Sequence, residues 1–303
     1  MDYNRYCRIT KPSNIIELIE YNKFLLGETS KMHLNWEMMK PEHFISDYER
    51  EQSKVAIRKK TTQYSLEEFS YTLNEIGYRS RPTAEFTMGM VGFYGCSFTM
   101  GVGLPEKHTF VNLFEKSTGL KCANFGISGA GSNKIMKAFI SSTSCLDIST
   151  AIFILPSIYR FELFYRTAES LRTQDIAPSN YRPKNAGTYL HYHKEHMERI
   201  KSVYALFADE QFADELVRNL EIIVSHCLLR NMQCFFTSWC QHVYQILCEY
   251  VNSSWILDFI DLYKLVPEAG DQGLGRDGLH PGPMTHESVA AALSSKFQIN
   301  VDR

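Results

Sequence analysis

Residues 88–101 read MGMVGFYGCSFTMG, an apolar run that passes through Gly95 into two small residues, Cys96 and Ser97. A short apolar run bounded by glycine is typical of a buried strand. Ser97 follows that strand directly, on a sharp turn that would lead into a helix. The stretch therefore places a hydroxyl at the carboxyl end of a strand, which is the edge where α/β sheets bind ligands.

The pattern around this stretch alternates between strand and helix signals. Strands are expected at 88–94, 121–125, 151–155, 233–237 and 255–259. Helices are expected at 109–117, with Gly119 as its stop, after Ser132 as its cap, through most of 197–229, and at 286–297. Such alternation predicts an α/β protein whose parallel sheet is covered by helices on both faces.

The first part of the chain follows a different pattern. Residues 15–19 have helical spacing, residues 47–60 are strongly charged, and residues 71–80 look extended with a turn at Gly77. We interpret residues 1–87 as an N-terminal extension packed on a core domain of residues 88–303.

Composition excludes several classes of protein. The net charge of −2 does not favour a nucleic-acid binder or a membrane-surface protein. No apolar run is long enough to cross a bilayer, and the first residues lack the apolar core of a secretory signal, so a cytoplasmic protein is expected. The eight cysteines include no CxxC pair, which argues for reduced thiols and against a structural zinc site. The oligomeric state is not indicated.

Three polar turns should meet at one edge of the predicted sheet. Ser97, the glycine-rich turn of residues 126–131 and Ser157 each follow the carboxyl end of an expected strand. Much later the chain reads Arg276-Asp277-Gly278-Leu279-His280-Pro281, which adds a carboxylate and an imidazole three residues apart. A hydroxyl, a base and an orienting acid form the minimum set for acyl transfer by a serine nucleophile.

These motifs and their order resemble the SGNH (GDSL-type) hydrolase superfamily, in its branch with a Gly-Cys-Ser-Phe-Thr first block. The resemblance covers roughly residues 88–300 and implies a three-layer α/β/α sandwich with a central parallel sheet, of flavodoxin-like type. It also implies a serine esterase that removes a small acyl group from a carbohydrate or similar alcohol. No cofactor or metal is implied, and the only partner expected is that ester substrate.

The resemblance also implies roles for individual residues. Ser97 corresponds to the nucleophile, His280 to the base that accepts its proton, and Asp277 to the acid that orients the imidazole. The oxyanion would be held by the backbone N–H groups of Ser97 and Gly129. Glycine at position 129 would let the main chain approach the developing charge without a Cβ in the way.

The third family block departs from the usual pattern. It normally contributes an asparagine to the oxyanion hole, but residues 154–162 read ILPSIYRFE. Ser157 or Arg160 is the candidate stand-in, and Arg160 is also a weaker candidate for binding substrate. Losing one oxyanion donor typically lowers kcat by about 10²–10³-fold. The alternative hypothesis is therefore a catalytically impaired relative that serves as a binding or assembly module.

Other interpretations of single motifs remain open at this level. Cys96 is a rival nucleophile, and the 126–131 turn could bind phosphate in a nucleotide-binding protein. His193 and His196 could hold a metal, although no carboxylate or thiol completes a recognisable set. Phe235, Phe236 and Trp239 could stack on a sugar, although core packing is the simpler expectation.

Overall fold

The computed structural model describes residues 12–26, 71–166, 171–176, 208–268, 273–275 and 280–301. Asp277, the charged stretch 47–60 and the histidines at 193 and 196 lie outside the described residues, so the predictions made for them stay predictions. Among the described residues, no helix is long and apolar enough to cross a membrane.

A parallel four-stranded sheet forms the centre of the molecule. Its strands are β1 (Met90–Gly95), β2 (Cys122–Gly126), β3 (Ile148–Leu155) and β6 (Gln233–Ser238), in the order β2-β1-β3-β6. All three neighbouring pairs are parallel. This is the flavodoxin-like doubly wound order. The predicted α/β/α sandwich with a central parallel sheet is confirmed.

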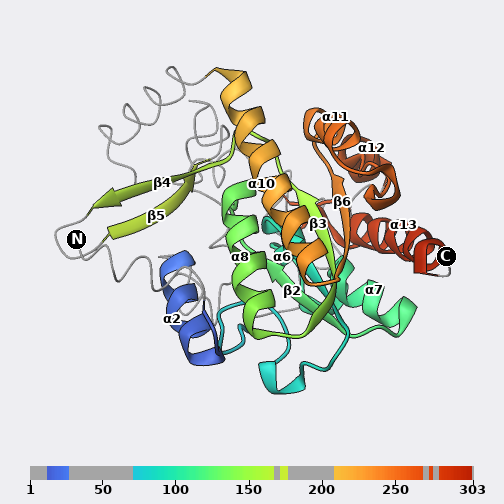
Figure 1. Ribbon diagram of the computed structural model, residues 1–303. Coiled ribbons are helices and arrows are strands. Elements are labelled where there is room, and N and C mark those ends of the chain that lie inside the picture. The colour runs from blue at the N-terminus through green and yellow to red at the C-terminus, as the bar shows by residue number, and fades with distance from the viewer. Residues whose placement is uncertain are drawn as a thin grey trace, which may run out of the picture.

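Helices cover both faces of the sheet (Figure 1). The helices α7 (Phe110–Thr118) and α13 (Pro283–Val301) pack against each other over one face. The helices α8 (Ser132–Cys145) and α10 (Asp209–Leu229) cover the other, with α2 (Ile15–Leu25) beside α8. Phe93 and Tyr94 are neighbours on β1 but belong to opposite apolar clusters, as expected for a strand buried on both faces.

Smaller elements complete the fold. A four-residue helix α6 (Ser97–Met100) follows β1, and α11 (Gln241–Tyr250) and α12 (Leu262–Glu268) follow β6. Three short 3₁₀ helices are also described: η3 (Thr83–Glu85), η4 (Glu106–His108) and η7 (Ser253–Trp255). The strands β4 (Phe161–Arg166) and β5 (Leu171–Ile176) form an antiparallel hairpin. This hairpin was not expected, because the two strands are recognised by their pairing and their sequences give no clear strand signal.

Three local predictions need correction. Residues 255–259 do not form a strand: η7 leads into a single parallel bridge between Ile256 and Phe236. Gly131 and not Ser132 caps α8, since the Ser132 hydroxyl accepts a bond from Asn219 of α10 instead. The last helix begins at Pro283 and not at residue 286. The first N–H groups of a helix have no intrahelical acceptor, so a proline at this position costs no hydrogen bond.

The described parts of the N-terminal region pack on the same core. Leu18, Tyr21 and Leu25 of α2 belong to the apolar cluster that α8 and α10 form over the sheet. Asn22 donates from its side-chain amide to the carbonyl of Ile76 at 2.8 Å, which joins α2 to the segment 71–81. The boundary proposed at residue 87 stays a prediction.

Candidate active site

Ser97 begins α6 directly after β1, on a turn that only glycine at position 95 permits. A Cβ on Gly95 would lie 2.0 Å from the Thr99 hydroxyl oxygen and 2.8 Å from the carbonyl oxygen of Ile154. Because Gly95 has no side chain, α6 and β3 can both lie close to the end of β1. Ser97 is 5% exposed, so the hydroxyl is more enclosed than a serine pointing freely into solvent.

The glycine-rich turn after β2 contacts the Ser97 turn. Gly95 pairs with Gly126 in the register of β1 and β2, and the N–H of Ile127 donates to the carbonyl of Gly95 at 2.9 Å. A Cβ on Gly126 would lie 2.3 Å from the backbone nitrogen of Met100, inside α6. The expected convergence of these two turns at one sheet edge is thus present.

Gly129 lies in that second turn with a left-handed backbone, φ +78°. No heavy atom lies within 4 Å of where its Cβ would be, so the conformation and not crowding favours glycine. Among the described residues, the N–H groups of Ser97 and Gly129 make no bond to a carbonyl in the turns and loops.

The turn after β3 brings Ser157 and Arg160 to the same edge. A Cβ on Gly131 would lie 2.2 Å from the carbonyl oxygen of Arg160, so the two turns touch through their backbones. The Ser157 hydroxyl accepts from the N–H of Tyr159 at 3.3 Å, a bond that leaves its own O–H proton for another acceptor. Ser157 is therefore able to donate, as an oxyanion donor must.

His280 is the first residue of the described stretch 280–301 and lies shortly before α13. A bridge pairs Leu274 with Pro281, and the N–H of Gly275 donates to the carbonyl of His280 at 2.7 Å. The sequence predicts that the His280 ring accepts the proton of the Ser97 hydroxyl. Catalytic hydrogen bonds are often long without substrate, so this contact stays a prediction. Asp277, the expected orienting acid, lies outside the described residues.

A second histidine links the His280 segment to the Ser97 turn. The ring of His286 contacts that of Phe98, the residue after Ser97, with 4.9 Å between ring centroids. Its Nδ1 accepts from the N–H of Phe110 at 2.9 Å, so its Nε2 carries the proton and has no partner. Burial, and then the charges of Arg79, His280 and His108, lower the pKa of His286 to about 3. This imidazole is neutral and structural.

The rival nucleophile Cys96 is placed differently. Its side chain is 1% exposed and belongs to the apolar cluster that contains Phe93 and Phe110. Cys96 is also the N-cap residue of α6, and its role as a rival nucleophile stays a prediction. The described residues hold no group of three histidine, cysteine or acidic side chains arranged for a metal.

Arg160 stacks on Trp239, which follows β6, with its Cζ 5.5 Å from the ring centroid. The adjacent Glu162 pairs with Lys137 of α8 and not with Arg160. Phe235 and Phe236 are buried core residues, so they are not available to stack on a sugar. Substrate binding by Arg160 stays a prediction.

Two polar residues near the site were not identified from the sequence. Asn124 of β2 donates to the carbonyl of Thr99 at 2.8 Å and accepts from the N–H of Gly126 at 2.9 Å. Arg79 donates to carbonyl groups at the end of α6. A single polar residue within an apolar strand, such as Asn124, was a usable signal, because a buried amide requires partners. Arg79 had no comparable signal in its extended stretch.

The chain is similar to several solved esterase structures. An esterase, EstA, from a Pseudoalteromonas species is 11% identical, with 71% of this chain and 100% of that chain covered and a TM-score of 0.45. A carbohydrate esterase family 2 enzyme from Corynascus thermopiles is 14% identical, with 74% and 69% covered and a TM-score of 0.42. A carbohydrate acetylesterase family member from Sinorhizobium meliloti is 12% identical, with 71% and 100% covered and a TM-score of 0.38.

No protein-family model matches the chain, and no curated protein does. Likenesses this distant do not assign a function, which has to come from the residues of the chain itself.

Proposed function

We propose that this chain is a serine ester hydrolase of SGNH type. The observation that carries the proposal is the contact between two turns: the turn that starts α6 with Ser97 lies against the turn that holds Gly129. This contact supports the proposal, because it brings the Ser97 turn and the glycine-rich turn to the carboxyl edge of a parallel sheet, where such folds bind ligands.

The reaction would proceed in two steps. The Ser97 oxygen attacks the ester carbonyl carbon while His280 takes the serine proton, and the resulting tetrahedral oxyanion accepts bonds from the N–H groups of Ser97 and Gly129. The carbon–oxygen bond to the alcohol then breaks, and the alcohol leaves with the proton from His280. Water attacks the acyl-serine with His280 again as base, which releases the acid and restores Ser97.

Two further residues complete the proposed machinery. Asp277 would accept the other ring N–H of His280 and so hold the base in one tautomer. The Ser157 hydroxyl would act as the third oxyanion donor in place of the family asparagine. The proposed substrate, from the family resemblance, is a small acyl ester of a carbohydrate or similar alcohol.

The deciding experiment is labelling with a fluorophosphonate probe, followed by peptide mapping and turnover of p-nitrophenyl acetate. We expect labelling on Ser97 alone, and loss of both labelling and turnover in Ser97→Ala. Two control variants should keep both: Cys96→Ala, which removes the rival nucleophile, and Ser144→Ala, a serine of α8 whose hydroxyl only donates to the Ile140 carbonyl.

Two outcomes would contradict the proposal. Labelling of a different residue would move the chemistry elsewhere in the molecule. Wild-type protein that is neither labelled nor active would favour the alternative of a binding or assembly module with the same fold.

A further inference from the structure

A segment outside the sheet and its covering helices lies against the end of α6. Residues 71–81 have no regular helix or strand, yet the side chain of Arg79 is only 1% exposed. Arginine is almost never buried this fully unless its guanidinium has partners. Its partners therefore indicate why the residue is there.

The guanidinium of Arg79 binds three carbonyl groups of the chain that leaves α6. Its Nη1 donates to the carbonyl of Gly101 at 2.6 Å and to that of Met100 at 3.3 Å. Its Nη2 donates to the carbonyl of Leu104 at 2.7 Å. The last carbonyl groups of a helix have no intrahelical partner, so Arg79 supplies donors to the end of α6, where the Gly101 carbonyl also accepts from the N–H of Leu104 at 3.3 Å.

Other anchors act on the same turn. Asn124 holds the Thr99 carbonyl, and the Tyr71 hydroxyl accepts from the N–H of Gly103 at 2.7 Å. The Arg79 guanidinium lies 4.4 Å from the centroid of the Tyr71 ring, within the range of a cation–π contact. The helix that Ser97 begins is thus held from its far end.

The buried position of Arg79 disfavours the positive charge of its guanidinium. Burial lowers the pKa of the Arg79 guanidinium, and the nearby Tyr71 and Glu106 only partly oppose this effect. A buried charge is usually no more stabilising than a well-packed apolar side chain. The planar fork of donors, which reaches several carbonyl groups at once, is what arginine supplies and an apolar side chain cannot.

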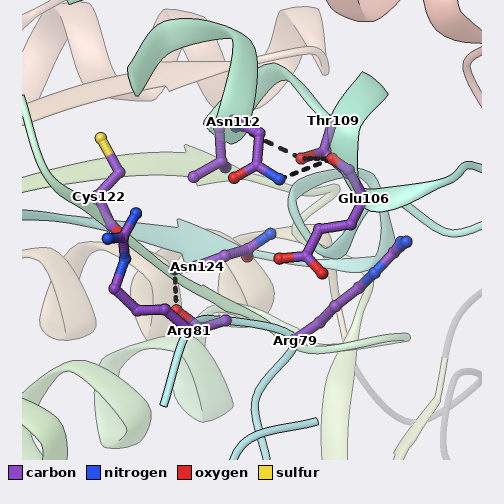
Figure 2. A pocket seen from close by; sticks show the side chains of 9 residues that line it. Arg79, Arg81, Glu106, Thr109, Asn112, Cys122 and Asn124 are labelled. Atoms are coloured by element: carbon purple, nitrogen blue, oxygen red, sulfur yellow. Dashed lines mark hydrogen bonds between the residues drawn. The ribbon is translucent and has the colours of Figure 1, made fainter. Parts of the chain in front are cut away.

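Arg81 provides an internal comparison from the same segment. Its Nε donates to the carbonyl of Cys122 at 3.2 Å, and its guanidinium pairs with Glu115 of α7. Arg79 and Arg81 extend to opposite ends of a polar pocket of about 40 Å³ (Figure 2). Arg81 therefore ties the segment to β2 and α7 without touching the Ser97 turn.

We propose that Arg79 is a positioning residue for Ser97: by holding the C-terminal carbonyl groups of α6, it sets the direction of the Ser97 hydroxyl and N–H. This inference rests on the proposed function. It gives Arg79 a role in the catalytic scaffold, whereas Arg81 only holds the same segment to β2 and α7.

The test compares Arg79→Lys with Arg81→Lys, which both keep the charge but lose the planar fork. The rate constant for fluorophosphonate labelling and the kcat and KM for p-nitrophenyl acetate are measured per folded molecule, with the melting temperature of each variant. We expect Arg79→Lys to lower the labelling rate and kcat by about 10²-fold, as small misplacements do, with KM little changed. Arg81→Lys should lower the melting temperature with labelling and kcat unchanged.

Free methylguanidinium gives a second readout, because it fits the space that Arg79→Ala would leave. Partial recovery of the labelling rate in Arg79→Ala, and none in Ser97→Ala, is expected. Should neither Arg79 variant fold, Tyr71→Phe removes one hydroxyl from the same turn and should slow labelling several-fold.

The outcomes separate the two proposals. If wild type is labelled on Ser97 and folded Arg79→Lys is labelled equally fast, the positioning role is wrong and the hydrolase stands. An unchanged labelling rate in Tyr71→Phe would count against it in the same way where the arginine variants do not fold. If wild type itself is not labelled, the proposed function fails and this inference fails with it.

Discussion

Gly126 and the backbone nitrogen of Met100 approach so closely that a Cβ at position 126 would lie 2.3 Å from that nitrogen. The end of β2 is therefore packed directly on the helix that Ser97 begins. Two motifs about 30 residues apart in the chain become one surface, and the position of Ser97 depends on a glycine in another strand.

Replacing Gly126 with alanine should displace α6. Overpacking of this kind typically costs about 1–3 kcal/mol in the free energy of unfolding, and we also expect slower fluorophosphonate labelling of Ser97. The control is Gly119→Ala, where φ is +73° and no atom lies within 4 Å, so a left-handed backbone alone should cost about 1–2 kcal/mol. Both variants should lose stability in urea, and equal labelling rates would contradict the prediction.

Asn124→Asp should destabilise the protein through the loss of one donor. The new oxygen would face the Thr99 carbonyl in a site where residue 124 is 6% exposed, which should cost about 1–3 kcal/mol or more in urea unfolding. Asn252→Asp is the matched change, because Asn252 uses only its oxygen, to accept from Ser254. A similar loss in both variants would show that the Thr99 contact is unimportant.

His286 predicts a pH-dependent stability. Its pKa is lowered from 6.5 to about 3 in the folded protein, chiefly by burial, so the unfolded chain binds the extra proton below pH 6.5. The free energy of unfolding is fully retained above that pH and should fall by about 1.4 kcal/mol per pH unit as the pH decreases towards 3.

The variant His286→Asn tests this dependence, because an asparagine oxygen can accept from the Phe110 N–H without titrating. Between about pH 6 and pH 4, urea unfolding of His286→Asn should show a correspondingly shallower slope than wild type. The exposed His242→Asn should retain the wild-type slope. A wild-type slope in His286→Asn would assign the acid sensitivity to other groups.

Lys137→Met should be strongly destabilising. Glu162 has no exposed side-chain surface and would lose the partner of its charge, which typically costs about 3–5 kcal/mol. Arg218→Met removes one partner of an exposed pair with Asp214 at 2.9 Å and should cost no more than about 0.5 kcal/mol. Chemical denaturation of the two variants measures the difference, and losses of equal size would refute the argument from burial.

Ser157→Ala tests the third oxyanion donor. We expect kcat to fall by about 10²–10³-fold with KM little changed, because the lost bond forms in the transition state. Ser157→Thr keeps the hydroxyl and should retain most of the activity. If alanine and threonine variants turn over p-nitrophenyl acetate equally well, another group fills the place of the family asparagine.

The elements with a strong local signal could be predicted from the sequence. The apolar runs that became β1, β2, β3 and β6 were recognised, and Gly119, the expected stop, is the C-cap of α7. The glycine-rich turn could be placed beside Ser97 because the carboxyl ends of parallel strands share one edge.

Elements that depend on distant partners could not be predicted. The run 255–259 has the composition of a strand, but only Ile256 forms a bridge with β6. In the hairpin of β4 and β5, the β5 sequence LRTQDI is mostly polar, so the pairing of the two strands is visible only in space. His286 gave no sign in the sequence that it would be buried between Phe98 and Phe110.

The sequence by itself determined the four central strands with the helices α7 and α8, and the positions of the hydroxyl, the glycine turn and the imidazole along the chain. These follow from periodicity and turn chemistry, which depend on neighbours within a few residues. Only the tertiary structure decided that Arg79 and Asn124 hold α6 and that Gly126 touches Met100. Burial and hydrogen bonding join residues far apart in the chain, and no local pattern records which of them will meet.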